Sequence, residues 1–205
     1  MRPMLIVFAG PNGSGKSTFT KTVKERCPGF PNLYINADDI ALQLGITAYN
    51  AAIEAENRRR EAIKARRSFA METVMSTPRK IDLMIEAKNM GYMVHLEYVV
   101  IQEPRVNVRR VQTRAAKGGH DVPPDKIISR YGRSIALLPK AFEISDTARI
   151  WNNSFKEPLF LAEKTMDGEV RIYPQDPPSK WDEENIRDLL GIRDGDMSGT
   201  MAPGV

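Results

Sequence analysis

The chain has 205 residues, of which 41% are hydrophobic and 27% are charged, and its formal net charge is +4. These values are typical of one globular domain, and the lack of an apolar run of about 18 residues argues against a membrane span. The single cysteine, Cys27, excludes an internal disulfide, so we expect a cytoplasmic protein. The small positive charge does not require a nucleic-acid partner, and we expect none.

Apolar runs alternate with helical patterns along the chain, which predicts an α/β fold with a mostly parallel sheet and flanking helices. The run Met4–Ala9 is too short for the apolar part of a signal peptide and predicts a buried strand. Ser76, Thr77 and Pro78 predict a helix that starts with a capping side chain, and Gly91 predicts its C-terminal cap. The expected strands cover residues 4–9, 33–36, 68–71, 92–101, 149–151, 158–162 and 170–173. The expected helices cover residues 16–26, 49–67, 76–91, 105–117, 127–141 and 181–190.

A glycine-rich segment follows the first strand. Its residues match the Walker A pattern G-x-x-x-x-G-K-[ST] at every fixed position, with a strand before it and a helix after it. The glycines let backbone N–H groups face a phosphate, Lys16 brings a cation to the β- and γ-phosphates, and the Ser17 hydroxyl reaches Mg²⁺. We therefore expect ATP with Mg²⁺ to bind Gly10, Pro11, Asn12, Gly13, Ser14, Gly15, Lys16, Ser17 and Thr18.

Acidic residues stand at the ends of the next two strands. Asp38 and Asp39 follow the second strand, and Glu72 with Thr73 follows the third. Because ligands of open parallel sheets bind at the carboxyl ends of the strands, we expect these side chains beside the glycine-rich segment. A carboxylate there can accept the proton of an attacking hydroxyl or organise Mg²⁺. Each acid taken singly, Asp39 especially, also fits a turn former or a helix cap.

A third group of residues surrounds the segment 114–124, which joins two helices and contains Gly118-Gly119. The glycines provide hinge freedom, so the segment is a candidate lid that excludes water and neutralises charge on a transferred phosphoryl group. We expect His120, Arg130 and Arg133 to contact phosphate from this lid; for His120, a helix cap or a solvent-facing position is an equal alternative. An ordinary solvated surface is the alternative for the basic side chains nearby, which are Arg105, Arg109, Arg110, Arg114, Lys117, Lys126, Arg130 and Arg133.

Four segments, 10–18, 36–41, 72–74 and 118–123, together resemble the zeta-toxin-like P-loop kinases, and the resemblance spans about residues 1–160. The best-known members phosphorylate a sugar hydroxyl of UDP-N-acetylglucosamine and are neutralised by a small antitoxin protein. The resemblance implies that Asp38 is the catalytic base, with Asp39 as the alternative. It implies that Glu72 and Thr73 hold the acceptor sugar, and we place Asp39 with them. It also implies that Arg114 stabilises the transferred phosphate, and it aligns His120 with the family's second phosphate-binding arginine.

These observations predict one P-loop kinase domain over residues 1–190 with a lid near 114–124, and a disordered tail over residues 191–205. The predicted activity is transfer of the γ-phosphate of ATP to a hydroxyl of a small acceptor such as UDP-N-acetylglucosamine, with Lys16, Asp38 and Arg114 as catalytic residues. The partner implied by the resemblance is an antitoxin protein. Two other classes stay open: a P-loop ATPase or ATP-gated interaction module, and a nucleic-acid end kinase, which the basic helices favour.

Overall fold

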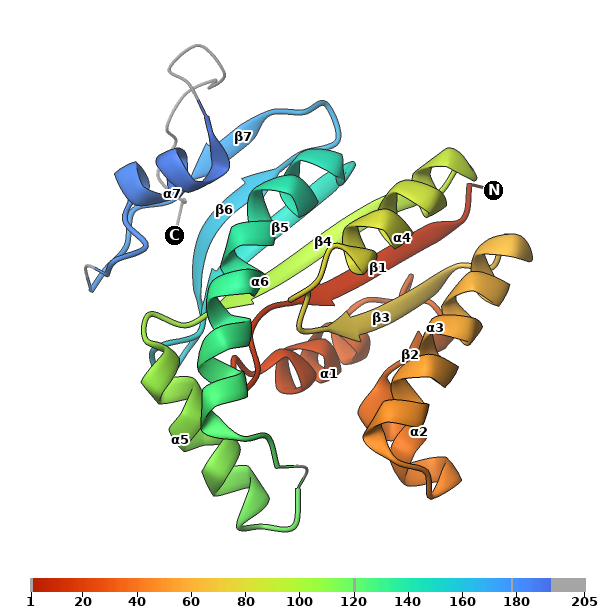
Figure 1. Cartoon of the computed structure of the whole chain (residues 1–205). Helices are drawn as coiled ribbons and strands as arrows, with labels where there is room; N and C mark the ends of the chain where they lie inside the picture. The colour runs from red at the N-terminus through yellow and green to blue at the C-terminus, as the bar shows by residue number, and fades with distance from the viewer. Residues whose placement is uncertain (1, 120, 178, 193–205) are drawn as a thin grey trace.

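The computed structural model describes residues 2–119, 121–177 and 179–192. These residues form a seven-stranded sheet with the strand order β2-β3-β1-β4-β5-β6-β7, flanked by helices (Figure 1). The strands are β1 (Met4–Ala9), β2 (Leu33–Ile35), β3 (Phe69–Thr73), β4 (Met93–Val100), β5 (Thr147–Asn152), β6 (Leu159–Lys164) and β7 (Val170–Ile172). The helices are α1 (Lys16–Arg26), α2 (Ala37–Leu44), α3 (Ala48–Lys64), α4 (Arg79–Asn89), α5 (Pro104–Ala115), α6 (Pro124–Ile144) and α7 (Glu183–Leu190).

The predicted α/β class is confirmed. Strands β1 to β5 pair in parallel, whereas β6 and β7 extend the sheet with antiparallel pairs. Among the described residues, no helix combines the length and the apolar character that crossing a membrane requires. The expected tail falls mainly on residues 193–205, which lie outside the described part of the chain.

Each face of the sheet has its own apolar core, because alternate residues of a strand point to opposite faces. Leu5 and Val7 of β1 belong to the main core, which also contains residues of α3, α4 and α6. Ile6 and Phe8 form a smaller core with Ala70 under α1. Figure 1 shows α4 and α6 in front of the sheet and α1 behind it. Helix α1, which follows the glycine-rich segment, therefore packs on the face of the sheet opposite α4 and α6.

The structure corrects the prediction at the end of β2. The sequence prediction had no helix between residues 36 and 49, but Ala37–Leu44 forms α2. Asn36 is its N-cap, because the Asn36 side chain accepts a hydrogen bond from the backbone N–H of Asp38, and Gly45 with φ of 63° ends it. Asp38 and Asp39 therefore lie in the first turn of a helix, whose positive end favours carboxylates.

The boundaries of β3 and α4 also differ from the prediction. β3 continues to Thr73, so Glu72 is a strand residue and pairs with Phe8 of β1. The predicted side-chain cap of α4 is wrong: no side chain of the described residues caps the helix, and Pro78 occupies the N-cap position without a polar group to offer. Gly91, with φ of 80°, stands one residue beyond the C-cap residue and ends α4 as a left-handed glycine.

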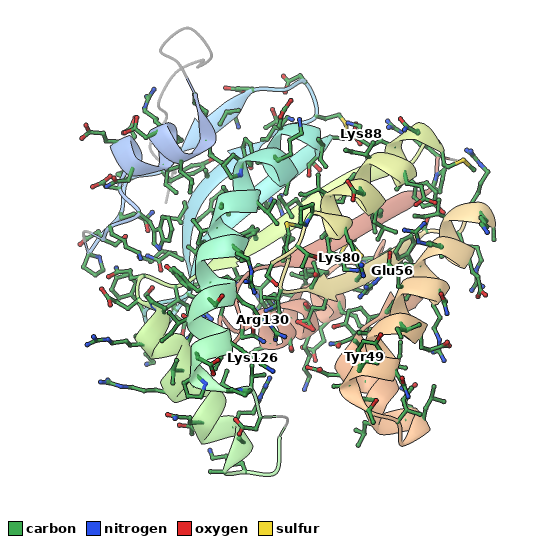
Figure 2. All side chains as sticks on the ribbon, in the orientation of Figure 1. Tyr49, Glu56, Lys80, Lys88, Lys126 and Arg130 are labelled. Atoms are coloured by element: carbon green, nitrogen blue, oxygen red, sulfur yellow. The ribbon has the colours of Figure 1, made fainter. Side chains whose placement is uncertain are left out.

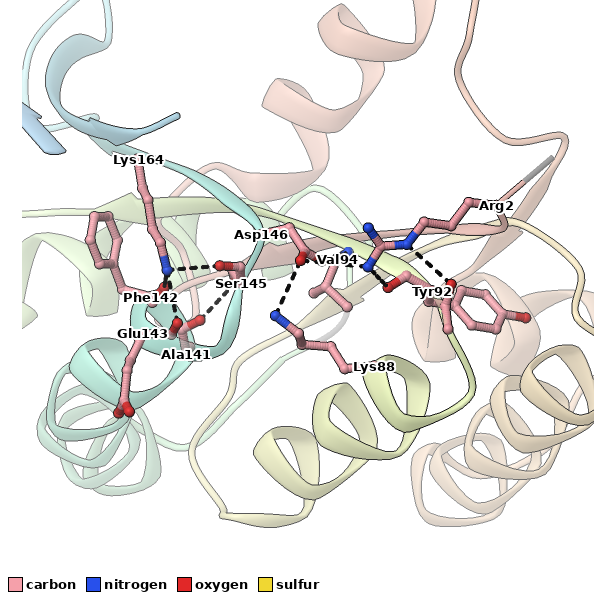
Figure 3. Close-up of polar contacts among 11 residues, drawn as sticks. Arg2, Lys88, Tyr92, Val94, Ala141, Phe142, Glu143, Ser145, Asp146 and Lys164 are labelled. Atoms are coloured by element: carbon pink, nitrogen blue, oxygen red, sulfur yellow. Dashed lines mark hydrogen bonds and ion pairs between the residues drawn. The ribbon is translucent and has the colours of Figure 1, made fainter. Parts of the chain in front are cut away.

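Polar contacts centred on Asp146 and Lys164 lie at the end of the sheet where β4 and β5 begin, away from the glycine-rich segment (Figure 3). Asp146 accepts hydrogen bonds from the N–H of Val94 at 2.7 Å and from the ammonium of Lys88 at 3.2 Å. The Lys164 ammonium donates to three carbonyl oxygens at the end of α6, those of Phe142, Glu143 and Ser145. These carbonyls have no partner within the helix, so Lys164 ties β6 to the end of α6.

We expect Asp146→Asn to lower the free energy of unfolding by about 1–2 kcal/mol at neutral pH, because the charge-assisted bonds to Val94 and Lys88 weaken. Burial raises the pKa of Asp146, but the hydrogen bonds from Val94 and Lys88 and the positive charges of Lys88 and Arg2 together lower it. A lowered pKa stabilises the folded protein above the unfolded-state pKa of about 3.9, and this contribution is lost as the pH falls below that value.

Urea denaturation of both proteins at several pH values tests this prediction. The difference in the free energy of unfolding between wild type and Asp146→Asn should be largest near neutral pH and should shrink below about pH 4. Glu157→Gln, a change of the same kind in an exposed loop, should give no such difference. A difference that stays constant across this pH range would contradict the role given to the Asp146 carboxylate.

Candidate active site

The P-loop, residues 10–17, joins β1 to α1, and Gly10 and Gly15 show why it needs glycines. Gly10 and Gly15 have φ of 139° and 91°, conformations that other residues rarely adopt. A Cβ atom at Gly10 would lie 2.2 Å from the carbonyl oxygen of Val99, and one at Gly15 would lie 2.3 Å from the side-chain nitrogen of Asn153. Both positions therefore need glycine because other backbone and side-chain atoms approach the loop closely.

Two asparagines that the sequence analysis missed hold the P-loop from outside. The Asn153 side chain donates to the carbonyl oxygen of Ser14 at 2.7 Å, and the buried Asn107 of α5 donates to that of Asn12. Both bonds engage carbonyl groups, which would repel a phosphate, and turn them toward the rest of the protein. No signal in a single sequence marks these asparagines, because neither belongs to a motif.

Lys16 is the cation of the P-loop, and its ammonium donates to the carbonyl oxygen of Pro11 at 2.9 Å. Burial lowers the pKa of Lys16 to about 8. The carboxylates of Glu72 and Asp38 act in the opposite direction, and Arg114 lowers the pKa of Lys16 further. These interactions show that charged groups from β3, α2 and α5 gather around one ammonium.

Glu72 is the centre of the hydrogen bonds next to the P-loop. Its Oε2 accepts from the Ser17 hydroxyl at 3.1 Å, from the Tyr34 hydroxyl at 2.9 Å and from the Asn36 amide at 2.6 Å. Burial, followed by the nearby Glu72 carboxylate, raises the pKa of Tyr34, so its hydroxyl stays protonated and donates. The Glu72 Oε1 is buried and has no hydrogen-bond partner within the described chain.

A pocket of about 710 Å³ opens beside Ser17. Asp38 and Asp39 line it from α2, and Arg114 with the glycines of the predicted lid lines it from the end of α5. Burial, followed by the neighbouring Asp38 carboxylate, raises the pKa of Asp39, while Lys24 acts to lower it. The structure thus brings the predicted base, its neighbour and the predicted phosphate-binding arginine to one pocket.

The start of the predicted lid lies against Arg114. Gly118 has φ of 85°, a left-handed conformation that suits glycine at a turn. A Cβ atom at Gly119 would lie 2.7 Å from Cγ of Arg114, so the stem of Arg114 packs on this glycine. His120, the next residue of the predicted lid, lies outside the described residues.

The remaining predicted residues lie farther from the pocket. Thr73 is not among the described residues that line it, and the Thr73 hydroxyl accepts a hydrogen bond from the N–H of Met75 at 3.0 Å. Arg133 is exposed, and its guanidinium donates to a serine hydroxyl of the same helix. Figure 2 shows Lys126 and Arg130 on the side of α6 that faces α2 and α3 in this view. Arg130 is half-buried there.

Several buried polar side-chain atoms around the P-loop have no hydrogen-bond partner among the residues that the structure describes. They are Asn12 Oδ1, Ser14 Oγ, Thr20 Oγ1, Glu72 Oε1 and Asn107 Oδ1. Folded proteins leave few buried polar atoms unsatisfied, and a concentration of them at one place needs an explanation. The hydroxyls of Ser14 and Thr20 could donate to a ligand, whereas the other three atoms can only accept a hydrogen bond.

Comparisons with known proteins identify similar sequences and similar folds. The sequence model of the Zeta toxin family matches residues 1–175. An uncharacterized protein of Haemophilus influenzae is 32% identical over 136 residues, which cover 64% of this chain and 94% of that protein.

Two solved structures share the fold. The AvrRxo1-ORF1:-ORF2 complex with ATP matches 98% of this chain with a TM-score of 0.66 and 16% identity, and this chain spans 66% of that one. A structure of the chromosomal toxin–antitoxin system PezAT of Streptococcus pneumoniae matches with a TM-score of 0.58 and 14% identity. The match covers 94% of this chain and 80% of the PezAT chain. At these identities the structural matches support the fold alone.

Proposed function

Because the chain belongs to the zeta toxin family, whose sequence model matches residues 1–175, we propose that it is a kinase that transfers the γ-phosphate of ATP to a hydroxyl group of a small molecule. The observation that carries the proposal is that Asp38 and Arg114 line one pocket and that both interact electrostatically with the ammonium of Lys16 in the P-loop. An enzyme that only hydrolyses ATP needs space for a water molecule, whereas a kinase needs a pocket for its acceptor. The 710 Å³ pocket beside Ser17 is large enough for a small molecule and supports the kinase.

The P-loop is the proposed site of ATP. Its glycines allow backbone N–H groups to approach the phosphates, and the N-terminal end of α1 favours an anion at the same place. Lys16 adds a full positive charge inside the loop. The partnerless oxygen of Ser14 lies in this loop and supports a polar ligand there.

The residues beside the P-loop fit Mg²⁺, which prefers oxygen ligands and keeps several water molecules. Ser17 donates its hydrogen to Glu72, so the lone pairs of its hydroxyl remain available for a metal. The partnerless Oε1 of Glu72 is suited to accept a hydrogen bond from a metal-bound water, while Tyr34 and Asn36 hold the carboxylate in place. Mg²⁺ bound with ATP would neutralise charge on the phosphates. These bonds favour Glu72 as a metal-site residue over the acceptor role that the family resemblance implies.

In the proposed reaction, the oxygen of the acceptor hydroxyl attacks the γ-phosphorus of ATP, and Asp38 accepts the proton of that hydroxyl. The bond between the γ-phosphorus and the β-phosphate oxygen breaks, and ADP is released. Arg114 stabilises the negative charge that develops on the transferred group. Asp38 and Arg114 are both exposed, so closure of the lid, residues 114–124, is needed to exclude water from the reacting groups. Asp39, next to the proposed base, remains a proposed acceptor-binding residue.

The first acceptor to test is UDP-N-acetylglucosamine, which the family resemblance suggests. A protein partner that neutralises the activity is a further proposal, and the fold shared with the toxin–antitoxin system PezAT is compatible with it. Thr73, Arg130 and Arg133 stay proposed contributors to acceptor and phosphate binding, with less support from the geometry than Asp38 and Arg114 have.

The experiment that tests the proposed function is mass spectrometry of a cell extract after incubation with the protein and ATP labelled in the γ-phosphate. We expect one hydroxyl-bearing metabolite to acquire the labelled phosphate with wild type and none to acquire it with Lys16→Ala. Label found only in inorganic phosphate would make the protein an ATPase. Label found at the ends of RNA or DNA would make it a nucleic-acid end kinase.

Lys16→Ala should remove most ATP binding and leave the fold intact, because Lys16 supplies the fixed cation inside the P-loop. ATP favours the charged ammonium, and the pKa of Lys16 in the free protein is lowered to about 8. The ATP affinity of the wild type should therefore fall as the pH rises above about 8, with protons taken up on binding in this range.

Calorimetric titration with ATP at several pH values, in two buffers of different ionisation enthalpy, measures both effects. Lys64→Ala removes an exposed lysine at the end of α3 and serves as the control, with wild-type affinity expected. Equal ATP affinity in Lys16→Ala and wild type would overturn the assignment of the site. An affinity independent of pH would remove the role given to the lowered pKa.

A further inference from the structure

One face of α1 continues from the P-loop into the pocket. Ser17, Thr20, Lys21 and Lys24 all line the pocket, and their spacing of three, four and seven residues places them on one side of the helix. The rise of an α-helix puts Lys21 about 6 Å and Lys24 about 10 Å beyond Ser17 along the axis. This face, which we call the α1 stripe, begins at the P-loop and ends with two ammonium groups.

Thr20, in the middle of the α1 stripe, lacks a partner for its hydroxyl. The side chain is 3% exposed, and its Oγ1 has no hydrogen bond to any described residue. Threonines inside helices often bond the carbonyl oxygen four residues earlier, but this one does not. A buried hydroxyl at the wall of a pocket is therefore available to a polar group of a ligand.

A second part of the pocket lining is apolar. It includes Ala41, Leu42 and Ile46 from α2 and the segment after it. Leu42 is 86% exposed, so a ligand that covers it would remove apolar surface from water. The pocket thus pairs a cationic wall with an apolar wall.

The charges of the pocket leave an excess of positive charge beside the proposed base. Asp38 and Asp39 face three cationic side chains of the lining, those of Lys21, Lys24 and Arg114. Lys24 interacts with Asp39 and acts to lower its pKa. Lys21 forms no ion pair with any residue that the structure describes. An anionic ligand group would complement this arrangement.

We propose that Lys21 and Lys24 bind an anionic group of the acceptor, a phosphate or a carboxylate. The site then selects acceptors that carry this group in addition to the hydroxyl presented to Asp38. The Thr20 hydroxyl binds the polar part between the two, and Leu42 contacts an apolar face of the same molecule. This inference rests on the proposed function for the identity of the pocket as the acceptor site.

The test is calorimetric titration of the full chain, saturated with Mg²⁺ and a non-hydrolysable ATP analogue so that the P-loop is filled. The probes are UDP-N-acetylglucosamine, N-acetylglucosamine 1-phosphate and the neutral N-acetylglucosamine. We expect the two anionic probes to bind at least about tenfold more tightly than the neutral sugar. Added salt should weaken the binding of the anionic probes only.

The Lys21→Gln/Lys24→Gln double variant should lose this preference, and its affinity for the ATP analogue should not change. Lys64→Gln removes one exposed lysine elsewhere and should behave as wild type. Both lysines of the double variant are exposed, and an unchanged melting temperature will show that it folds.

Three results would overturn the proposal: anionic probes that bind the double variant as tightly as wild type, an equal loss of affinity for the neutral sugar, or no binding of any anionic probe. Because the readout is binding, a protein that selects anions but transfers no phosphate would remove the proposed function and leave the anion subsite. Transfer of phosphate to neutral acceptors alone would support the proposed kinase function and remove the anion subsite.

Discussion

Asp38→Asn should lower turnover by about two to four orders of magnitude and leave ATP affinity unchanged, which is the usual effect of removing a general base. The carboxylate of Asp38 lines the pocket and interacts with the Lys16 ammonium, so it lies between the proposed ATP site and the proposed acceptor site. An amide of nearly the same shape cannot accept the proton of the acceptor hydroxyl. Steady-state kinetics with the acceptor found by mass spectrometry, together with calorimetric titration with ATP, measure the two effects.

Asp39→Asn is the matched control, because Asp39 lines the same pocket from the same helix turn. Burial and the neighbouring Asp38 carboxylate raise the pKa of Asp39, and its loss should have a mild effect on turnover. If Asp39→Asn strongly lowered turnover and Asp38→Asn lowered it only slightly, Asp39 would be the base. If both variants kept full turnover, the first turn of α2 would not be catalytic.

Arg114→Ala should lower kcat about a hundredfold or more, the effect seen when a preorganised donor to the transition state is removed. Arg114 lines the pocket and packs on Gly119 at the start of the lid. A cation brought close by lid closure stabilises the charge of the transferred group more than it stabilises bound ATP. The loss should therefore be larger in kcat than in KM for ATP.

Arg105→Ala tests whether any arginine of α5 would have the same effect. Arg105 is exposed in the first turn of α5, far along the helix from the lid, and its removal should leave the kinetics unchanged. The same steady-state measurements compare the two variants. An unchanged kcat in Arg114→Ala would remove the lid from the mechanism and leave Arg114 as a surface residue.

The P-loop and the alternation of strands and helices were predictable because their signals are local. The Walker A residues occupy eight consecutive positions, and β1 and α1 flank them as expected. Helix α2 escaped prediction because it has only eight residues, and its acidic first turn also fits a turn that follows the strand. Asn36 and Gly45, which cap it, become informative only when the intervening residues are known to be helical.

The hydrogen bonds around the site were not predictable, because they depend on how the strands are ordered. The sheet places β3 beside β1, and Glu72 therefore reaches Ser17, which is 55 residues away in sequence. Asn153 reaches the P-loop across 139 residues. The α1 stripe with Lys21 and Lys24 has a helical spacing in the sequence, but its proposed function depends on the pocket that α2 lines together with it.

Transfer of phosphate to an acceptor other than water is the central claim, and the ratio of ADP to inorganic phosphate tests it most directly. Both products are measured in one reaction that contains ATP and a small-molecule extract, first with wild type and then with Asp38→Asn. We expect wild type to form more ADP than inorganic phosphate, with the difference recovered in one phosphorylated metabolite, and Asp38→Asn to abolish the excess. Equal amounts of ADP and inorganic phosphate with wild type would contradict the claim.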